Sequence, residues 1–302
     1  MASVVCLGIA VLDHVFTMPA FPQRPIKHFA REYHMAGGGN AGTAAIAVTR
    51  AGGSATFLGR LGADENARVL LAELSEFGVD VSHVRLIPGA QSGVSAILID
   101  QQGERIIVNY ADPRLDPDPS WLEEKLTLLK QPNVAALGDL RWQPGTETLL
   151  ACAKASGLPA VLDADLSPEA FSEGALQAAS HALFSEPALL QYAETSDRDA
   201  ALRSVRQRLG NWVGFTAGAE GTFWLEEGRV QHQQAFPIQP VDTLGAGDVF
   251  HGVFALGLAE GLEVPGAIRL ASASAALKCS RTGGRSAIPL REEIETFMAQ
   301  HG

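Results

Sequence analysis

The stretch Val241-Asp242-Thr243-Leu244-Gly245-Ala246-Gly247-Asp248 carries the most specific signal in this chain. The small residues Gly245, Ala246 and Gly247 predict the start of a helix, where free backbone N–H groups and the helix dipole attract anions. Such a cradle can stabilise the charge on a transferring phosphoryl group. Asp248 follows in the first turn, where its carboxylate can accept a proton from a hydroxyl group. A plain glycine-rich turn, with Asp248 starting the helix, is the alternative for this string alone.

A second glycine-rich string lies near the other end of the chain. Gly37-Gly38-Gly39-Asn40 precedes a run of small residues at 41–50. Glycines let a backbone approach a ligand closely, so this string is a candidate substrate-binding turn. A tight turn followed by a closely packed helix is the alternative.

The region between the two strings alternates between strand and helix patterns. Such alternation predicts an α/β fold with a Rossmann-like, mostly parallel sheet flanked by helices. The strand candidates are 134–137, 160–163, 181–184 and 212–216, the helix candidates are 121–129, 147–155 and 200–209, and a late hairpin and three closing helices (247–260, 265–279 and 291–299) follow. We expect one domain over residues 1–302.

Two segments fall outside this alternation, at about 12–36 and 90–112. We assign both to a small β-sheet lid over the open face of the main sheet, because ligands of such sheets bind at the carboxyl ends of the strands. An exposed lid sheet could pair with a second copy, so a homodimer formed through the lid is expected.

Composition excludes several other classes of protein. The formal net charge of -11 argues against a nucleic-acid partner, and no apolar segment reaches the roughly 20 residues that span a bilayer. The three cysteines are far apart, which favours a reducing, cytoplasmic location. A dinucleotide-binding oxidoreductase is disfavoured, because no Gly-x-Gly-x-x-Gly follows the first strand.

The strings, in their order along the chain, resemble those of a known family. Residues 37–62 and 242–255 resemble the two signature regions of the PfkB (ribokinase-like) carbohydrate kinases. Thr216-Ala217-Gly218-Ala219-Glu220-Gly221 resembles the family's nucleotide-binding strand end, and Arg281-Thr282-Gly283-Gly284 resembles its C-terminal nucleotide-side loop. The resemblance implies a ribokinase-like fold, ATP with Mg2+, and phosphoryl transfer to a sugar hydroxyl.

The resemblance also implies roles for single residues. Gly245, Ala246 and Gly247 would form the anion hole, and Asp248 would be the catalytic base. The sugar would lie against Asp13 and the turn, and the nucleotide near the strand end and C-terminal loop. The implied substrate-binding residues are Asp13, Gly38, Gly39 and Asn40, and the implied nucleotide-binding residues are Thr216, Gly218, Gly221 and Gly283.

One motif departs from the family pattern. Many members carry Asn-x-x-Glu at a strand end, linked to Mg2+ and phosphate, where this chain has Ser185-Glu186-Pro187-Ala188. Glu186 is therefore the candidate metal residue. Asp163 and Asp165 also end a strand, where capping of the following turn is the favoured interpretation.

Three polar residues bear on the choice of sugar. Lys27 and Asn109 lie in the two lid segments, and Arg141 follows the strand at 134–137. Two cations near one pocket indicate an anionic group on the substrate. On composition alone, solvated surface cations are the favoured interpretation.

Several more particular strings resemble the branch of 6-deoxy-6-sulfofructose kinases. They are residues 103–110, 141–142, 184–187, 247–252 and 276–279. In that branch a Lys, an Asn and an Arg surround the sulfonate, matching Lys27, Asn109 and Arg141, whereas a proline can replace Asn40. The resemblance implies phosphorylation of the 1-hydroxyl of 6-deoxy-6-sulfofructose in sulfoglycolysis. The alternatives are a kinase for fructose or another ketohexose, a nucleoside or a sugar phosphate, and a sugar-sensing protein on the same fold.

Overall fold

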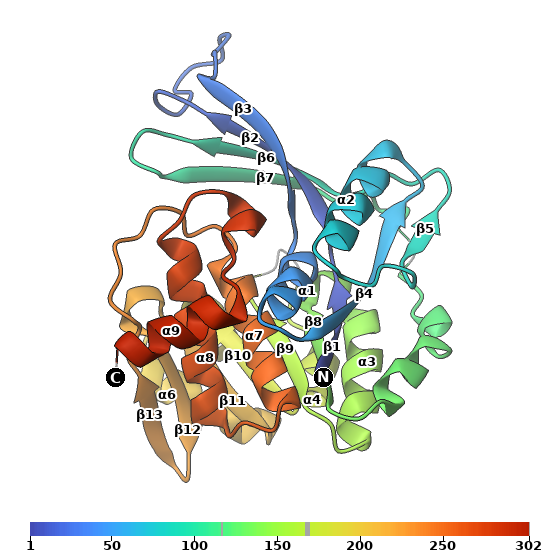
Figure 1. The fold of residues 1–302 in the computed structure, drawn as a ribbon, viewed down its shortest axis with the longest axis vertical. Helices are drawn as coiled ribbons and strands as arrows, with labels where there is room; N and C mark the ends of the chain where they lie inside the picture. The colour runs from blue at the N-terminus through green and yellow to red at the C-terminus, as the bar shows by residue number, and fades with distance from the viewer. Residues whose placement is uncertain (116, 167–169, 302) are drawn as a thin grey trace.

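A computed structural model describes residues 1–115, 117–166 and 170–301. Its main sheet has nine strands in the order β13-β12-β11-β10-β9-β8-β1-β4-β5 (Figure 1). The strands are β1 (Ser3–Gly8), β4 (Ser54–Gly62), β5 (Arg85–Ile87), β8 (Val134–Asp139), β9 (Ala160–Ala164), β10 (His181–Ser185), β11 (Trp212–Thr216), β12 (Thr222–Glu226) and β13 (Arg229–Gln233). From β5 to β11 every pairing is parallel, and the predicted late hairpin β12–β13 adds two antiparallel strands at one edge.

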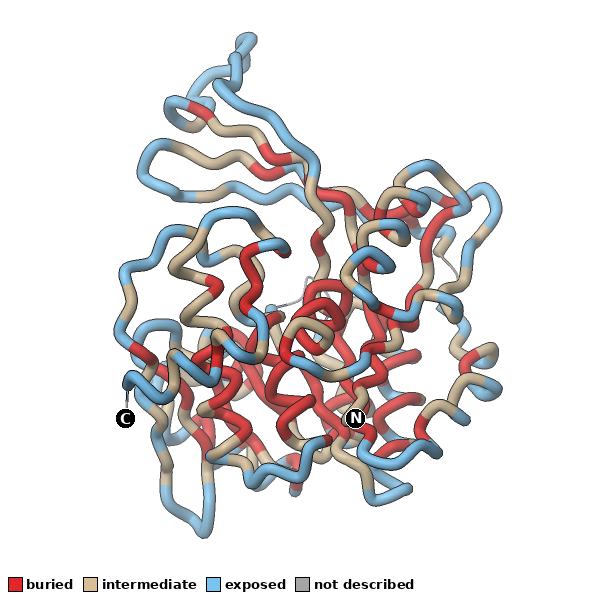
Figure 2. Tube along the Cα trace, in the orientation of Figure 1, coloured by how far each residue is buried: buried red, intermediate tan, exposed pale blue. Residues whose placement is uncertain are grey.

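Helices cover both faces of this sheet. They are α1 (Asn40–Arg50), α2 (Glu65–Glu76), α3 (Gln143–Ala155), α4 (Glu173–Ala178), α5 (Glu186–Ala193), α6 (Arg198–Leu209), α7 (Ala246–Ala259), α8 (Val264–Cys279) and α9 (Arg291–Gln300). Strand β1 shows why both faces are filled: Val4 and Cys6 join the apolar core with α1, α7 and α8, while Val5 and Leu7 join the core with α3, α5 and α6. The buried residues concentrate around these strands (Figure 2).

The helix predicted at 121–129 is wrong. The segment forms two 3-10 helices, η1 (Ser120–Leu122) and η2 (Lys125–Lys130). Only Leu122 and Leu129 are buried in these helices. So short a run with two buried anchors gains too little from packing to hold a regular α-helix. Three further 3-10 turns are η3 (Leu140–Trp142), η4 (Gly218–Glu220) and η5 (Gly284–Ala287).

The predicted lid is a separate four-stranded sheet with the order β3-β2-β6-β7. It contains β2 (Val11–Thr17), β3 (Glu32–Gly38), β6 (Val94–Ile99) and β7 (Arg105–Tyr110), which we call the lid. It projects away from the main sheet, and the loop joining β2 to β3 lies at its far end (Figure 1). The prediction of a mostly parallel, helix-flanked sheet with a small β lid is therefore confirmed.

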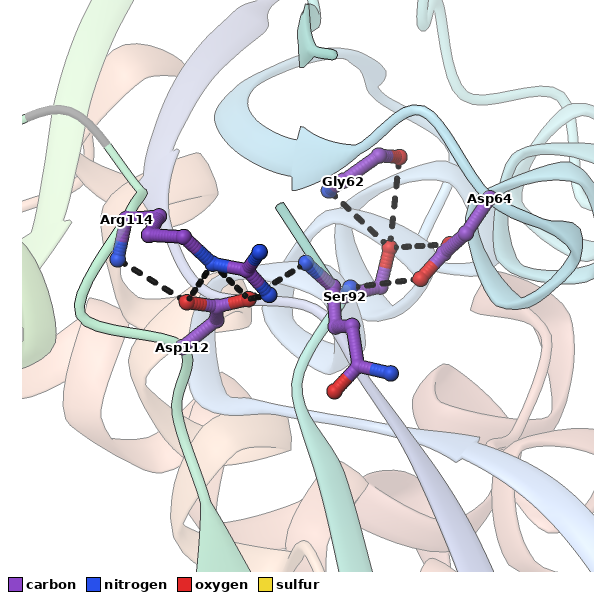
Figure 3. Close-up of polar contacts among 6 residues, drawn as sticks. Gly62, Asp64, Ser92, Asp112 and Arg114 are labelled. Atoms are coloured by element: carbon purple, nitrogen blue, oxygen red, sulfur yellow. Dashed lines mark hydrogen bonds and ion pairs between the residues drawn. The ribbon is translucent and has the colours of Figure 1, made fainter. Parts of the chain in front are cut away.

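Two carboxylates fasten the β6–β7 hairpin at its base (Figure 3). Asp64, at the start of α2, accepts hydrogen bonds from the backbone N and the Oγ of Ser92, both at 2.7 Å. Asp112, which follows β7, accepts from the backbone N of Gln91 at 2.7 Å and is gripped by the Arg114 guanidinium. The residues entering and leaving the hairpin are thus fixed, while its strands extend outward.

No helix in the described parts of the chain is long and apolar enough to cross a membrane.

Candidate active site

The sequence predicts an anion cradle at Gly245, Ala246 and Gly247, and in the structure α7 begins at these residues. Gly245 caps the helix with φ 74°, a left-handed conformation that favours glycine. The Ala246 N–H makes a long 3.3 Å hydrogen bond to the Thr243 carbonyl oxygen. A β-carbon on Gly247 would meet no described atom within 4 Å, so the space beside this turn is open. The N–H groups of a first helical turn have no partner within the helix, which leaves them to a ligand.

Asp248 stands in this turn and is half-buried. Burial raises the pKa of Asp248 to about 7, and the negative charges of Asp163 and Asp165 act in the same direction. His251 and Arg285 oppose the rise. A carboxylate that titrates near neutral pH is well suited to accept a proton from a hydroxyl group.

The loop before the cradle is held by two cations. The Lys278 side chain is only 2% exposed, and its Nζ lies 3.0 Å from the backbone oxygen of Asp242 and 3.1 Å from its Oδ2. Arg105, the first residue of β7, contacts Asp242 Oδ1 at 3.0 Å and Thr243 Oγ1 at 3.3 Å. Asp242 therefore joins α8, the lid and the loop that leads into α7.

Three of the residues predicted to bind the sugar, Asp13, Gly38 and Asn109, lie on strands of the lid. Asp13 is 7% exposed and bonds to the Ser95 side chain, and burial raises the pKa of this carboxyl. The register pairs Asp13 with Ser95 and Ser95 with Asn109, so these residues form one row across the lid sheet. A β-carbon on Gly38 would lie 2.1 Å from Asp13 Oδ2, so only glycine leaves Asp13 in this position.

The end of the glycine string turns tightly into α1. Gly39 has φ 92°, and a β-carbon there would lie 2.6 Å from the Ile9 carbonyl oxygen. Asn40, the first residue of α1, donates a hydrogen bond from Nδ2 to Asp163 Oδ2 at 3.0 Å. Asn40 thus links the turn that carries Gly38 and Gly39 to the end of β9.

Arg285, which the sequence analysis did not single out, binds this turn from the other end of the chain. Its side chain is 4% exposed and donates to Glu73 Oε2 and to the Gly38 oxygen, both at 2.7 Å, and to Thr43 Oγ1 at 3.2 Å. Both Asp13 and Asp248 are within its electrostatic reach. Arg285 follows the predicted nucleotide-side loop directly, which is the only local signal that could have pointed to it.

Replacing Arg285 with methionine should destabilise the protein by about 3 kcal/mol, because it leaves the Glu73 carboxylate and the Gly38 carbonyl oxygen without their buried cation. Urea unfolding measures this loss. The matched control is Arg68→Met, which breaks an exposed ion pair with Glu65 and should cost less than about 0.5 kcal/mol. Equal stabilities for the two variants would contradict the role of Arg285.

Asp139 is a second residue that the sequence analysis did not assign to the site. Its buried carboxylate accepts hydrogen bonds from the backbone N of Ile9 at 2.9 Å, of Ala41 at 3.3 Å and of Arg141 at 2.9 Å. Burial raises the pKa of Asp139 to about 6. Asp139, at the end of β8, thereby holds both the residue that follows β1 and the start of α1. These contacts help to position the glycine turn that precedes α1.

The two cations predicted for the sugar lie in different places. Arg141 lies in η3 at the end of β8, and its Nη2 donates to the Leu166 oxygen at 2.8 Å. Lys27 is exposed on the loop joining β2 to β3, at the end of the lid far from the helices (Figure 1). The structure therefore brings Asn109 into the row with Asp13 but leaves Lys27 on the distal loop.

The predicted nucleotide residues lie on two glycine turns. Thr216 ends β11, Gly218 begins η4 with φ 54°, and Gly221 ends it with φ 101°. A β-carbon on Gly221 would lie 2.1 Å from the Gln233 oxygen, so this turn requires glycine. Gly283 precedes η5 with φ 121°. Glycine-rich turns of this kind allow close approach of a ligand to the backbone.

Glu186, the predicted metal residue, begins α5 directly after β10. Its carboxylate already pairs with Arg198 Nε at 2.5 Å, and Arg198 also binds Glu220. Within the described residues, no group of three or more His, Cys, Asp or Glu side chains is arranged to hold a metal. Mg2+ in nucleotide sites is held largely by phosphate oxygens and water, so few protein ligands are needed.

A polar row at the lid base, a helix start with free N–H groups and a half-buried carboxylate at that start are the parts that a phosphotransferase acting on an alcohol group needs. Comparison with known proteins agrees: the chain belongs to the pfkB family of carbohydrate kinases, whose sequence model matches residues 1–291.

The relatives extend over the whole chain. It is 27% identical to a ribokinase of Haemophilus influenzae, over 97% of both chains. A crystal structure from Agrobacterium tumefaciens, assigned as a ribokinase, is 39% identical, has a TM-score of 0.91 and covers 99% of this chain and 98% of its own. An Arabidopsis thaliana ribokinase solved with ribose and ATP has the same fold, with a TM-score of 0.88, 20% identity and 98% of both chains covered.

Proposed function

We propose that this carbohydrate kinase transfers the γ-phosphoryl group of ATP to the 1-hydroxyl of 6-deoxy-6-sulfofructose, forming 6-deoxy-6-sulfofructose 1-phosphate and ADP in sulfoglycolysis. The observation that carries the kinase chemistry is the pairing of Asp248 with the open first turn of α7. The choice of sugar rests on the sequence strings that resemble those of the 6-deoxy-6-sulfofructose kinases, together with Asn109 and Arg141.

In the proposed reaction, Asp13 and the Gly38–Gly39 turn orient the sugar, and Asp248 accepts the proton of the attacking hydroxyl. The new bond forms between that oxygen and the γ-phosphorus as the bond to the β-phosphate oxygen breaks. The backbone N–H groups of Gly245, Ala246 and Gly247 stabilise the charge on the transferring group. Arg285 holds the Gly38–Gly39 turn in place by donating a hydrogen bond to the Gly38 carbonyl oxygen.

ATP as the phosphoryl donor is supported by membership of the kinase family and by the nucleotide in the Arabidopsis structure. We propose that it lies along Thr216, Gly218, Gly221 and Gly283. Mg2+ would reach the site with ATP and neutralise phosphate charge, and Glu186 is the protein carboxylate that we propose to contact it. Because Arg198 pairs with Glu186, any contact would be through water or would require that ion pair to open.

The sulfonate is proposed to bind Lys27, Asn109 and Arg141. Asn109 shares a row with Asp13, and Arg141 is fixed through Asp139 at the end of β8. The exposed distal position of Lys27 means that it would meet a sugar only if the loop bends inward or if a second copy presents it.

Steady-state kinetics with four acceptors test the choice of sugar. We expect kcat/KM for 6-deoxy-6-sulfofructose to exceed that for fructose, ribose and fructose 6-phosphate. Arg141→Ala should lower kcat/KM for sulfofructose by about tenfold or more while changing that for fructose much less, because only the former has a sulfonate to pair. Equal or better turnover of fructose or ribose by the wild type would overturn the sulfofructose assignment and leave the kinase chemistry intact.

Phosphorylation of ribose is the alternative, favoured by the similarity to ribokinases over the whole length of the chain.

We further propose a cytoplasmic homodimer formed through the lid. The outer strands of the lid expose large apolar side chains on the face opposite Asp13, which a second lid would cover, namely Tyr33, Met35, Ile106, Val108 and Tyr110. The three cysteines are free, in keeping with a reducing compartment.

A further inference from the structure

A buried histidine lies directly beneath the cradle. His251, one turn after Gly247 on α7, is only 3% exposed. Its Nδ1 lies 2.7 Å from the Gly247 carbonyl oxygen, and its Nε2 lies 3.2 Å from the Leu183 carbonyl oxygen. Nε2 also lies 3.6 Å from Asp163 Oδ1.

Within the described residues, the polar atoms close to this ring are oxygens that accept hydrogen bonds. A neutral imidazole has one N–H donor and one nitrogen acceptor, so either neutral form would set a nitrogen lone pair against an oxygen lone pair. An imidazolium carries an N–H on both nitrogens and satisfies both contacts. Burial raises the pKa of the Asp163 carboxyl, and a positive charge on His251, 3.6 Å away, opposes that rise, so each charge favours the other.

The buried pair is tied to both halves of the site. Asp163 accepts the Asn40 amide on its other oxygen at 3.0 Å, so the pair reaches the start of α1. On the opposite side, His251 Nδ1 is hydrogen-bonded to the carbonyl oxygen of Gly247, a cradle residue. A charged pair placed this way is costly to bury unless its hydrogen bonds are satisfied, and here each partner has additional ones.

We propose that His251 is held as an imidazolium paired with Asp163, and that this buried cation is a positioning residue that fixes the cradle and keeps Asp248 ready to accept a proton. The positioning role rests on the proposed function, because it assumes that Asp248 is the catalytic base. The positive charge of His251 is argued from its contacts alone and does not depend on that function.

Four charged groups act on the Asp248 carboxyl: Asp163 and Asp165 from the end of β9, His251 from its own helix, and Arg285 from η5. Burial and the two aspartates raise the pKa of Asp248, whereas His251 and Arg285 lower it. Loss of the imidazolium removes a charge that lowers the pKa of Asp248. The acid limb of the pH profile, set by Asp248, should then move to higher pH.

Histidine 15N NMR on the intact wild-type protein tests the charge without any turnover. At pH 7 we expect both ring nitrogens of His251 to carry a proton, because both face oxygen acceptors. In Asp163→Asn, which removes the counter-charge, we expect one of the two nitrogens to be unprotonated at the same pH. A neutral His251 ring in the wild type at pH 7 would overturn the proposal, whatever the enzyme proves to phosphorylate.

The pH dependence of kcat/KM for the best acceptor sugar tests the role. His251→Gln and His251→Asn remove the charge, and Asn keeps a donor near the Nδ1 position while Gln keeps one near Nε2. Both should move the acid limb upward by about half a pH unit or more. The control is His83→Gln, which removes a surface histidine paired with Asp80 at 3.8 Å and should leave the profile unchanged. Lower kcat with an unmoved acid limb in both variants would reduce His251 to a packing role and contradict the proposal.

Discussion

Asp248→Asn is expected to lower kcat by about 10³-fold, while the KM values for ATP and sugar change by less than about threefold. The amide keeps the size and the polar contacts of the side chain but accepts no proton at neutral pH. Steady-state kinetics with saturating ATP measure the effect. The matched control is Asp199→Asn, an exposed carboxylate in the first turn of α6, which should leave kcat unchanged.

The same variant should be more stable than the wild type at alkaline pH. Folding raises the pKa of Asp248 from 3.8 to about 7. Its favourable contribution is therefore complete below the unfolded pKa and is lost as the pH rises through about 7. At pH 8 we expect Asp248→Asn to raise the free energy of unfolding by about 1–2 kcal/mol, measured by urea unfolding. Wild-type turnover by this variant would refute the base assignment, and reduced stability would contradict the electrostatic account of the site.

Gly38→Ala is expected to lower kcat/KM for the sugar by about 10²-fold with little change in the KM for ATP. The added methyl group would lie 2.1 Å from Asp13 Oδ2 and 2.7 Å from its Cγ, so the buried Asp13 carboxyl must move. A displacement of about 1 Å in a residue that orients a substrate can cost that much. Kinetics with each substrate varied in turn separate the sugar effect from the nucleotide effect.

Gly266→Ala is the matched control for that substitution. Gly266 lies in α8, and a β-carbon there would approach only the Leu262 β-carbon, at 3.8 Å. Alanine should therefore be neutral for activity and slightly stabilising, since glycine is a poor helix former. If Gly38→Ala retained wild-type kcat/KM for the sugar, the placement of Asp13 as the sugar-orienting residue would be wrong.

Local patterns were enough to predict the frame of the molecule. Alternating strand and helix patterns predicted the main sheet, and two breaks in that alternation predicted the lid. The helix start at Gly245–Gly247 and the turn at Gly37–Gly39 were predictable because backbone conformation there depends on neighbouring residues. Each needs only a few adjacent small side chains.

The supporting contacts were out of reach because they join distant parts of the chain. Arg285 meets the Gly38 oxygen across 247 positions, and Lys278 meets Asp242 across 36. A lone Arg or Lys in a sequence is by default a surface residue. Only the folded chain shows that these two are buried and that each holds one of the glycine strings.

The residues predicted to bind the sugar show the same limit. Asn109 was predicted near the sugar, and the lid register sets it in the row of Asp13. Lys27 was grouped with it because both belong to lid segments, yet the loop that carries Lys27 lies at the far end of the lid. Membership of a segment does not fix distance within it, since a β-strand advances roughly 3.3 Å per residue.

Sugar-dependent turnover of ATP tests the central claim most directly. Phosphorus NMR of wild-type protein with ATP, Mg2+ and each acceptor should show one phosphate ester on the sugar for every ADP formed, with 6-deoxy-6-sulfofructose the best acceptor. The Asp248→Asn variant under the same conditions should form almost none. ADP formation that no sugar accelerates, or a phosphate ester formed equally well by the Asp248→Asn variant, would contradict the account.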